Sequence, residues 1–387
     1  MRKKIVILGS TGSIGKTTLN IIKKDIKNFE IVLLTTNNNI KELSKQINIY
    51  KPKNVLIFDK KKYLLFVNKN SNKKMNIFNN VDDFKKKNPK KVDYTMCAIS
   101  GLEGLNPILN LISLSKKIAI ANKESIICGW NLIENKLKKY KTIFLPVDSE
   151  HFSIWSLINK NKTELIDKIF ITASGGPFLK LSKNMMSKIS PSQAIKHPNW
   201  SMGKKISIDS ATMMNKIFEV IETQKIFNLS KSKIGILVHE DSYLHALVKF
   251  KNGITKLLVH DTNMEIPIFN TLYEKKNKFL KTKKLDLNKL NDLKLHYIDK
   301  KKFPVTLILD KISNQNSLFE TVIVATNDEL VDLFLKKKIT YLQLQKYLTK
   351  FLCSNLFSKF KLKKPKNIED IMDLNRYVRL KVRGLCI

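Results

Sequence analysis

The chain has 387 residues, of which 43% are hydrophobic and 27% charged, as is typical of a globular protein with two or three domains. It has no run of about 18 apolar residues, and an apolar strand pattern begins at Lys4, so we expect a cytosolic protein without a membrane span, signal peptide or transit peptide. The net charge is +38, but only four of the 71 basic residues are arginine and the lysines are dispersed, which argues against specific nucleic-acid binding.

The first motif is an apolar run followed by closely spaced glycines. Residues 4–8 predict a strand, Gly9, Gly12 and Gly15 a tight turn, and the next apolar residues a helix. Such a turn lets a pyrophosphate approach the backbone at the helix N-terminus, where N–H groups and the helix dipole favour an anion. The spacing is not the stricter G-x-G-x-x-G, so an ordinary connection stays open, but three of only 12 glycines in one turn favour a nucleotide site.

The second predicted strand, Glu30–Leu34, bears on the choice of nucleotide. In NAD-binding proteins an acidic residue at about this point binds the ribose 2′-hydroxyl. Here the run Asn37–Asn39 follows instead, with Lys41 nearby, and amides can donate hydrogen bonds to a 2′-phosphate. We therefore expect NADPH rather than NAD.

Further apolar runs extend this pattern, at residues 54–58, 94–99, 117–120 and 142–147. Helical patterns separate them, which predicts a doubly wound sheet and a dinucleotide-binding domain over residues 1–149. Ligands of such sheets bind beyond the carboxyl ends of the strands. Asn122–Ser125 and Asp148–Glu150 follow two of these ends, so we expect them at the ligand site.

A second α/β segment is predicted over residues 150–274. A strand at residues 168–171 leads to Ser174-Gly-Gly, a turn that offers a hydroxyl and N–H groups to phosphate unless it is only a glycine-rich connection. Residues 197–219 then gather His, Trp, Ser, Asn, Lys and acidic residues with little apolar periodicity, which a purely structural segment does not need. We expect Trp200 on a mobile loop that covers a polar, phosphorylated ligand.

Three carboxylates of this region suit a metal site. Asp148 and Glu150 are two residues apart, and Glu219 is expected with Asn215 and Lys216 on the first turns of a helix. Together the acids suit Mg²⁺ or Mn²⁺, and Co²⁺ is also compatible. Taken singly, other interpretations stay open: a solvated loop pair or a helix N-cap for Asp148 and Glu150, and an exposed helix face for Glu219 with Glu222.

The rest of the chain changes character. Residues 275–303 are lysine-rich and weakly periodic, which predicts a linker, and residues 304–387 have the periodicity of a small helical bundle. The predicted fold class is therefore α/β: a Rossmann-like nucleotide domain, an α/β catalytic domain and a C-terminal helical domain.

Jointly, the motifs resemble those of the 1-deoxy-D-xylulose 5-phosphate reductoisomerase family over almost the whole chain. They are Gly9-Ser-Thr-Gly-Ser-Ile-Gly15, Ala121-Asn-Lys-Glu-Ser125, Pro146-Val-Asp-Ser-Glu-His151, Ser174-Gly-Gly-Pro-Phe178 and His197–Glu219. The resemblance implies a V-shaped, three-domain homodimer with a flexible lid. It also implies rearrangement of 1-deoxy-D-xylulose 5-phosphate, by retro-aldol cleavage and recombination, and its reduction by NADPH to 2-C-methyl-D-erythritol 4-phosphate, in the non-mevalonate pathway to isoprenoid precursors.

The resemblance also assigns roles to residues. Asp148, Glu150 and Glu219 would bind the metal that chelates substrate oxygens, and Lys216 would join them in catalysis. Substrate contacts are implied for Ser149, Glu150, Ser174, His197, Trp200, Ser210, Asn215, Lys216 and Glu219, with His197 and Trp200 to Met202 in the lid. NADPH contacts are implied for Thr11, Gly12, Ser13, Ile14, Asn37, Asn38, Asn39, Asn122, Lys123, Glu124 and Gly203. Lid closure would exclude water from a reactive aldehyde.

Three segments depart from the family pattern. Asn37–Asn39 replaces a Gly-Lys/Arg-Asn sequence, which bears on the strength of the 2′-phosphate contact. His239-Glu-Asp-Ser242 replaces His-Pro-Gln-Ser, and Tyr273-Glu274 replaces Trp-Pro. We expect the last two near dimer or linker surfaces, with altered packing rather than altered chemistry.

Two other classes of protein stay open. Another NADP-dependent dehydrogenase, such as a semialdehyde or homoserine dehydrogenase, would differ in metal dependence, and a semialdehyde dehydrogenase would need a nucleophilic cysteine. Neither Cys97 nor Cys128 has a setting that favours one, and the wide spacing of all four cysteines predicts reduced thiols. A basic nucleic-acid-binding protein would need arginine-rich stripes with interleaved aromatic residues, which the sequence lacks.

Overall fold

The computed structural model describes residues 2–70, 75–158, 163–200, 202–274 and 278–386. Ser201 of the predicted lid and residues 275–277 of the predicted linker lie outside the described residues. The chain divides into two compact units. The first comprises Met1–Ser125, Asn131–Asp148 and Met264–Leu280, and the second Ile126–Trp130, Ser149–Asn263 and Lys281–Ile387.

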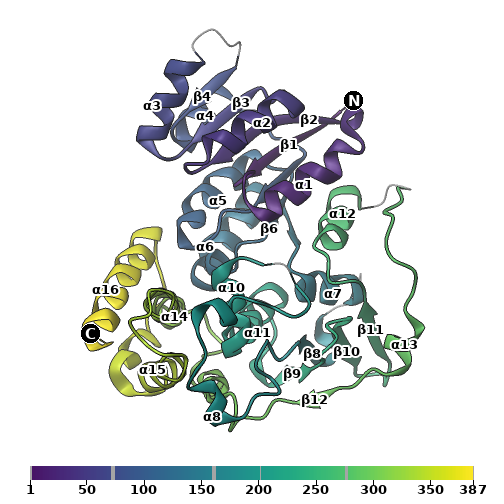
Figure 1. Cartoon of the computed structure of the whole chain (residues 1–387). Helices are drawn as coiled ribbons and strands as arrows, with labels where there is room; N and C mark the ends of the chain where they lie inside the picture. The colour runs from purple at the N-terminus through teal and green to yellow at the C-terminus, as the bar shows by residue number, and fades with distance from the viewer. Residues whose placement is uncertain (1, 71–74, 159–162, 201, 275–277, 387) are drawn as a thin grey trace. The chain divides into compact units, whose positions relative to one another are not determined.

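The first unit contains a parallel sheet, coloured purple to blue in Figure 1. Its strands are β1 (Lys3–Leu8), β2 (Phe29–Thr36), β3 (Asn54–Ile57), β4 (Asn76–Phe78), β5 (Tyr94–Cys97), β6 (Lys117–Ile120) and β7 (Ile143–Pro146). Their spatial order is β4-β3-β2-β1-β5-β6-β7, so the winding reverses between β1 and β5. The predicted doubly wound α/β fold is confirmed. Only the short edge strand β4 lacked a signal in the sequence.

Helices connect these strands, because two parallel strands cannot be joined by a short hairpin and need a longer crossover. They are α1 (Ser13–Lys23), α2 (Ile40–Tyr50), α3 (Lys60–Lys69), α4 (Val81–Lys87), α5 (Leu105–Leu111) and α6 (Lys123–Tyr140), with 3₁₀ turns at Ile26–Asn28, Leu102–Gly104 and Ile112–Leu114. Residues 5–8 of β1 are fully buried, because the helices of a doubly wound sheet cover both of its faces.

Glycines shape the turn after β1. Gly9 has a φ of +75°, and a Cβ there would lie 2.6 Å from the carbonyl oxygen of Ala98. A Cβ on Gly15 would lie 2.5 Å from the Cα of Ser10. Gly12 is the N-cap of α1 and has no side chain to satisfy the first N–H groups of that helix. The turn therefore presents backbone donors at the point where the sheet reverses, the usual place for an anionic nucleotide.

Two segments are grouped differently from the expected domain pattern. Ile126–Trp130, expected in the nucleotide domain, belong to the second unit. Residues 264–280, placed in the catalytic domain up to residue 274, belong to the first unit, where α12 (Glu265–Tyr273) packs against α1. The hydroxyls of Tyr94 and Thr271 are 3.0 Å apart, and the ring of Tyr273 lies edge-on to Phe29. Tyr273 is therefore buried in the first unit rather than exposed at a linker surface. The other boundaries of the three-domain division stay predictions.

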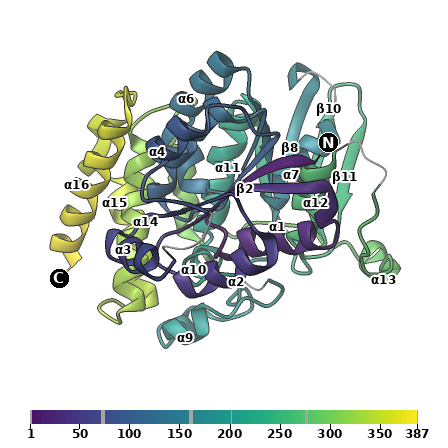
Figure 2. The ribbon, with the colours of Figure 1, turned by 90° about the horizontal axis from the view of Figure 1, so that it is seen from above.

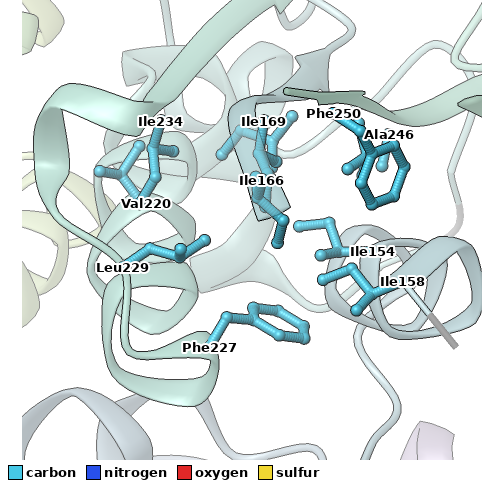
Figure 3. Close-up of a cluster of buried hydrophobic side chains, with 12 residues drawn as sticks. Ile154, Ile158, Ile166, Ile169, Val220, Phe227, Leu229, Ile234, Ala246 and Phe250 are labelled. Atoms are coloured by element: carbon cyan, nitrogen blue, oxygen red, sulfur yellow. The ribbon is translucent and has the colours of Figure 1, made fainter. Parts of the chain in front are cut away.

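The second unit is built on a mixed sheet with the order β11-β10-β8-β9-β12. Its strands are β8 (Ile166–Ala173), β9 (Ile234–Val238), β10 (Leu244–Phe250), β11 (Thr255–Val259) and β12 (His296–Tyr297). Helices α7 (Ser149–Ile158) and α11 (Met214–Phe227) pack against this sheet. Figure 3 shows the core between them, in which Ile154, Val220 and Ile169 meet. The predicted linker also contributes β12 and α13 (Leu287–Asn291), so part of it is structured.

The C-terminal helices α14 (Phe319–Leu335), α15 (Tyr341–Cys353) and α16 (Ile368–Cys386) pack on one another, as both ribbon views show (Figures 1 and 2). This is the predicted helical region. The remaining elements are α8 (Lys183–Met186), α9 (Pro191–Ala194), α10 (Lys204–Thr212) and 3₁₀ segments at Thr163–Leu165, Lys231–Lys233, Pro304–Lys311 and Asn355–Phe360. Within the described ranges, we find no helix with the length and apolar character needed to span a bilayer.

The glycine turn leads to a stability prediction. Gly15→Ala should lower the free energy of unfolding by about 1–3 kcal/mol, because the new methyl group meets backbone atoms that cannot move aside. Gly384→Ala is the matched control: no atom lies within 4 Å of a Cβ at this position of α16, so stability should rise by up to about 1 kcal/mol. Urea denaturation of both variants checks this, and equal effects would contradict it.

Candidate active site

Three acidic residues named from the sequence come together. Asp148, Glu150 and Glu219 each offer a carboxylate oxygen, and these atoms lie within 4.8 Å of one another. Asp148 directly precedes α7 and Glu150 lies in the first turn of that helix, so the chain itself limits their separation. An all-oxygen donor set of this kind suits a hard divalent cation such as Mg²⁺ or Mn²⁺.

Two lysines lie among these carboxylates. The ammonium of Lys216 is 2.5 Å from Glu150 Oε1 and 2.5 Å from Glu219 Oε2, and all three side chains are buried. Burial lowers the pKa of Lys216, but the two carboxylates raise it to a net value above its ordinary one. Lys123 forms an ion pair with Asp148. Lys216 is therefore held in its charged form by the carboxylates beside it.

A break between α10 and α11 places the second set of polar groups. Met213 has a φ of +71° and separates the two helices. Asn215, Lys216 and Glu219 then lie on the first two turns of α11, as expected. Asn215 Nδ2 donates to Glu219 Oε1 at 2.5 Å, while its Oδ1 is buried without a hydrogen-bond partner among the described residues. That oxygen is available to a ligand.

His151 supports this arrangement, although its role was missed in the sequence. Its ring is fully buried, and Nε2 lies 3.1 Å from both the Glu219 carbonyl oxygen and Thr223 Oγ1. This joins α7 to the turn of α11 that holds Glu219. The only signal was its place directly after the two acids, which does not distinguish a positioning residue from an ordinary buried histidine.

Ser174 and His197, both predicted to contact the substrate, contact each other. His197 Nδ1 accepts hydrogen bonds from the backbone N–H groups of Asn199 (3.1 Å) and Trp200 (3.0 Å). Its hydrogen is therefore on Nε2, which donates to Ser174 Oγ at 3.0 Å. Since Gly176 N–H also donates to that oxygen, Ser174 keeps its own hydrogen for another acceptor, such as a phosphate oxygen. Burial, and then the charge of Lys216, lowers the pKa of His197 to about 4.

The predicted lid contacts one of the departures from the family pattern. Trp200 lies edge-on to His245, with the ring centroids 6.1 Å apart. Asn199 Nδ2 donates to the Glu240 carbonyl (2.5 Å) and to Ser242 Oγ (3.1 Å). The segment His239–Ser242 also reaches the predicted linker, since His239 Nδ1 lies 3.1 Å from the Lys294 carbonyl. The segment that contains the two replaced residues, Glu240 and Asp241, therefore contacts both the lid and the linker.

The remaining substrate residues have simple positions. Ser149 is buried at the start of α7, and its hydroxyl donates to Glu150 Oε2 at 2.5 Å. Ser210 lies half-buried in the last turn of α10, and within the described ranges its hydroxyl has no hydrogen-bond partner. Gly203, predicted to contact NADPH, is the exposed N-cap of α10 and lies in the second unit.

The residues predicted to bind the nucleotide divide into two groups. Thr11, Gly12, Ser13 and Ile14 surround the start of α1, where Thr11 Oγ1 lies 2.8 Å from Thr36 Oγ1. Asn37 and Asn38 are exposed just beyond β2, which leaves their amides accessible to a ligand.

Two other asparagines have structural tasks that the sequence did not reveal. Asn39 Oδ1 accepts from Glu42 N–H at 3.1 Å and caps α2. Asn122 Oδ1 accepts from Ser125 N–H at 2.6 Å, and its Nδ2 donates to the carbonyl oxygens of Gly101 and Ile99. Both asparagines are helix N-caps, a role that accounts for asparagine on local grounds. Beside Asn122, Glu124 is buried in α6.

These features define a class of protein. The first unit has the sheet order and glycine turn of a dinucleotide-binding fold, and the carboxylate group with its lysines suits a divalent cation and an anionic ligand. Cys97 and Cys128 are buried, and burial raises the pKa of Cys97, which disfavours a thiolate nucleophile. The class is thus a nucleotide-dependent enzyme with a carboxylate metal site rather than a cysteine dehydrogenase.

Comparison with known proteins identifies the family. Residues 5–129 match the model of 1-deoxy-D-xylulose 5-phosphate reductoisomerase, and residues 144–227 and 260–381 match two models of its C-terminal domains. A protein of that name from Pelagibacter ubique (strain HTCC1062) is 56% identical over the full length of both chains. Another, from Thermoanaerobacter sp. (strain X514), is 37% identical over 88% of this chain and 90% of its own. The chain belongs to the 1-deoxy-D-xylulose 5-phosphate reductoisomerase family.

Solved structures agree with this assignment. The 1-deoxy-D-xylulose 5-phosphate reductoisomerase from Zymomonas mobilis in complex with NADPH superimposes with a TM-score of 0.90 at 30% identity, covering 100% of this chain and 99% of the other. A DOX-P reductoisomerase with NADPH, fosmidomycin and magnesium gives 0.89 at 28% identity, covering 99% and 98%.

The contacts of His197 lead to a pH prediction. Its folded pKa of about 4 lies below the ordinary value of 6.5, so the unfolded chain binds more protons between these two values. The contribution of His197 to stability should be complete above pH 6.5 and be lost as the pH falls toward 4. NMR titration of the ring, assigned with His197→Asn, should show a pKa near 4 and a hydrogen on Nε2. A midpoint near 6.5 would contradict the assigned contacts.

Proposed function

We propose that this protein catalyses the rearrangement and NADPH-dependent reduction of 1-deoxy-D-xylulose 5-phosphate to 2-C-methyl-D-erythritol 4-phosphate, in the non-mevalonate pathway to isoprenoid precursors. The proposal rests on the neighbouring carboxylates of Asp148, Glu150 and Glu219, with Lys123 and Lys216 paired to them, in a chain that belongs to this family. Relatives solved with NADPH and with magnesium support the two cofactors.

The carboxylates would hold Mg²⁺ or Mn²⁺. The donor set fits, because its oxygens lie within 4.8 Å of one another and the Asn215 Oδ1 beside them is buried without a partner among the described residues. A bound cation supplies a Lewis acid that stabilises negative charge on substrate oxygens. Lys216 would donate hydrogen bonds to the same oxygens from its ammonium group, which the two neighbouring acids orient and keep protonated against the opposing effect of burial.

The glycine turn would hold NADPH, which when bound supplies a hydride. Residues 11–14 would place backbone N–H groups of α1 on its phosphates. The exposed amides of Asn37 and Asn38 would donate to the 2′-phosphate, together with the Nδ2 group of the capping Asn39. Asn122 would act by shaping the end of the strands, and Lys123, Glu124 and Gly203 complete the proposed contacts.

The hydroxyls of Ser174 and Ser210 would bind the substrate phosphate, with Asn215 and Lys216 beside them. The Ser174 oxygen already accepts hydrogen bonds from His197 Nε2 and Gly176 N–H. Its own hydroxyl hydrogen therefore points away from these two donors and can be donated to an anion. His197 would orient Ser174 from the lid, and Trp200 would exclude water from the reacting carbonyl. Ser149 would contact the substrate next to Glu150.

We further propose that the enzyme works as a homodimer in the cytosol, as the family resemblance implies. Light scattering of the purified protein during gel filtration should give twice the chain mass of 44.7 kDa at micromolar concentration. A single-chain mass with full activity would reject the dimer.

The activity and the metal site are tested together. NADPH oxidation with 1-deoxy-D-xylulose 5-phosphate should require Mg²⁺ or Mn²⁺ and stop on addition of a chelator. Asp148→Asn should lower kcat/KM about 100-fold or more, because it removes the charge of one metal ligand. Asp167→Asn, which changes an exposed carboxylate paired with Lys249, is the control and should match wild type. Metal-independent turnover, or equal rates in the two variants, would reject the proposed site.

A further inference from the structure

A buried hydrogen bond connects the C-terminal helices to the helix that carries Ser210. Asn327 of α14 is fully buried, and its Nδ2 donates to Asp209 Oδ1 at 2.7 Å. The second oxygen of Asp209 lies 3.1 Å from Lys205 Nζ, which also lies 3.1 Å from Asp328 Oδ1. Asp209 is only 2% exposed, so its charge depends on these donors. The last turn of α10 is thereby tied to α14.

A second contact holds the other side of Ser210. The hydroxyl of Tyr341, on α15, donates to the carbonyl oxygen of Ala211 at 2.6 Å. The same ring lies edge-on to Phe178, with the centroids 5.3 Å apart. Tyr341 is fully buried, and Gln345 donates to its hydroxyl at 3.2 Å, which orients the hydroxyl hydrogen toward Ala211. The residues on both sides of Ser210 are therefore held by the C-terminal helices.

The end of α10 also meets the turn that carries Ser174. Gly176 has a φ of +71°, and a Cβ there would lie 2.8 Å from the carbonyl oxygen of Ser210 and 2.9 Å from the Cα of Ala211. The backbone at Gly176 therefore contacts the backbone at Ser210 and Ala211. Because this contact sets the distance between the Ser174 and Ser210 hydroxyls, a shift of α10 would change that distance. These are the two hydroxyls that have a hydrogen available for an anion.

We infer that Asn327 is a positioning residue for the phosphate subsite formed by Ser174 and Ser210. The Asn327 amide holds one oxygen of Asp209, and Lys205 holds the other. These contacts keep the Asp209 carboxylate away from an anion bound next to it, and they fix the position of α10 relative to α14. Without this donor the buried Asp209 carboxylate loses the hydrogen bond that ties it to α14, and α10 is less firmly positioned. The inference rests on the proposed function, which assigns phosphate binding to Ser174 and Ser210.

The experiment compares Asn327→Ala with Thr326→Val. Thr326 precedes Asn327 on α14, is fully buried, and has a hydroxyl without a hydrogen-bond partner among the described residues. Three quantities are measured: the inhibition constant of inorganic phosphate against substrate, KM with kcat, and the dissociation constant of Mn²⁺ by electron paramagnetic resonance. In Asn327→Ala we expect the phosphate constant and KM to rise about tenfold, with kcat and Mn²⁺ affinity within about twofold of wild type. Thr326→Val should match wild type in all three.

Asn327→Ser, which keeps a shorter donor, should give a smaller rise in the phosphate constant, and it replaces Asn327→Ala if the alanine variant does not fold. Unchanged phosphate affinity in Asn327→Ala would overturn the inference. So would an equal loss in Thr326→Val, or a parallel loss of Mn²⁺ affinity. Calorimetry of the wild-type protein with inorganic phosphate distinguishes a failure of this inference from a failure of the proposed function. If the wild-type protein binds phosphate but does not turn over the substrate, the proposed function is rejected, and the role of Asn327 in phosphate binding can still be tested.

Discussion

The buried contact of Lys216 with Glu150 and Glu219 constrains the whole second unit. Charges inside a protein persist only when opposite charges and hydrogen bonds compensate for lost hydration. Glu150 is on α7 and Lys216 with Glu219 on α11, so the two helices must be held at a set distance. The isoleucine-rich core beneath them and the ring of His151 between them supply that rigidity (Figure 3). The same contacts hold the carboxylate oxygens close together, as a site for a divalent cation requires.

The C-terminal helices contact α10, the helix that carries Ser210. Glu329 of α14 has no exposed surface, and both of its oxygens pair with arginines of α16, Arg379 at 3.1 Å and Arg383 at 2.6 Å. Three of the four arginines in the chain are on α16. Since guanidinium forms directional contacts with carboxylates, arginine is used here to fasten helices together. These ion pairs fasten α14 to α16, and α14 in turn contacts α10 through Asn327 and Asp209.

The high positive charge has little to do with the site. Most of the lysines are exposed, and their ion pairs with surface acids contribute little stability. Lys123 and Lys216 differ from these surface lysines, because their side chains are only 13% and 8% exposed and pair with Asp148 and Glu150 of the proposed metal site. Composition alone cannot distinguish these two from 65 others, because burial depends on neighbours far away in sequence. Only the motifs around them, and the resemblance these support, indicated a role.

The sequence by itself determined the local features: the strand-turn-helix at Gly9–Gly15, the alternation of strands and helices, and the polar start of α11. These depend on backbone sterics and on apolar spacing, which act over a few residues. Tertiary structure alone decided that Lys216 pairs with Glu150, that Asn39 and Asn122 cap helices, that α12 joins the first unit, and that Asn327 reaches Asp209. Such pairings depend on which buried faces and unsatisfied polar groups come together when the whole chain packs, and no short pattern records that.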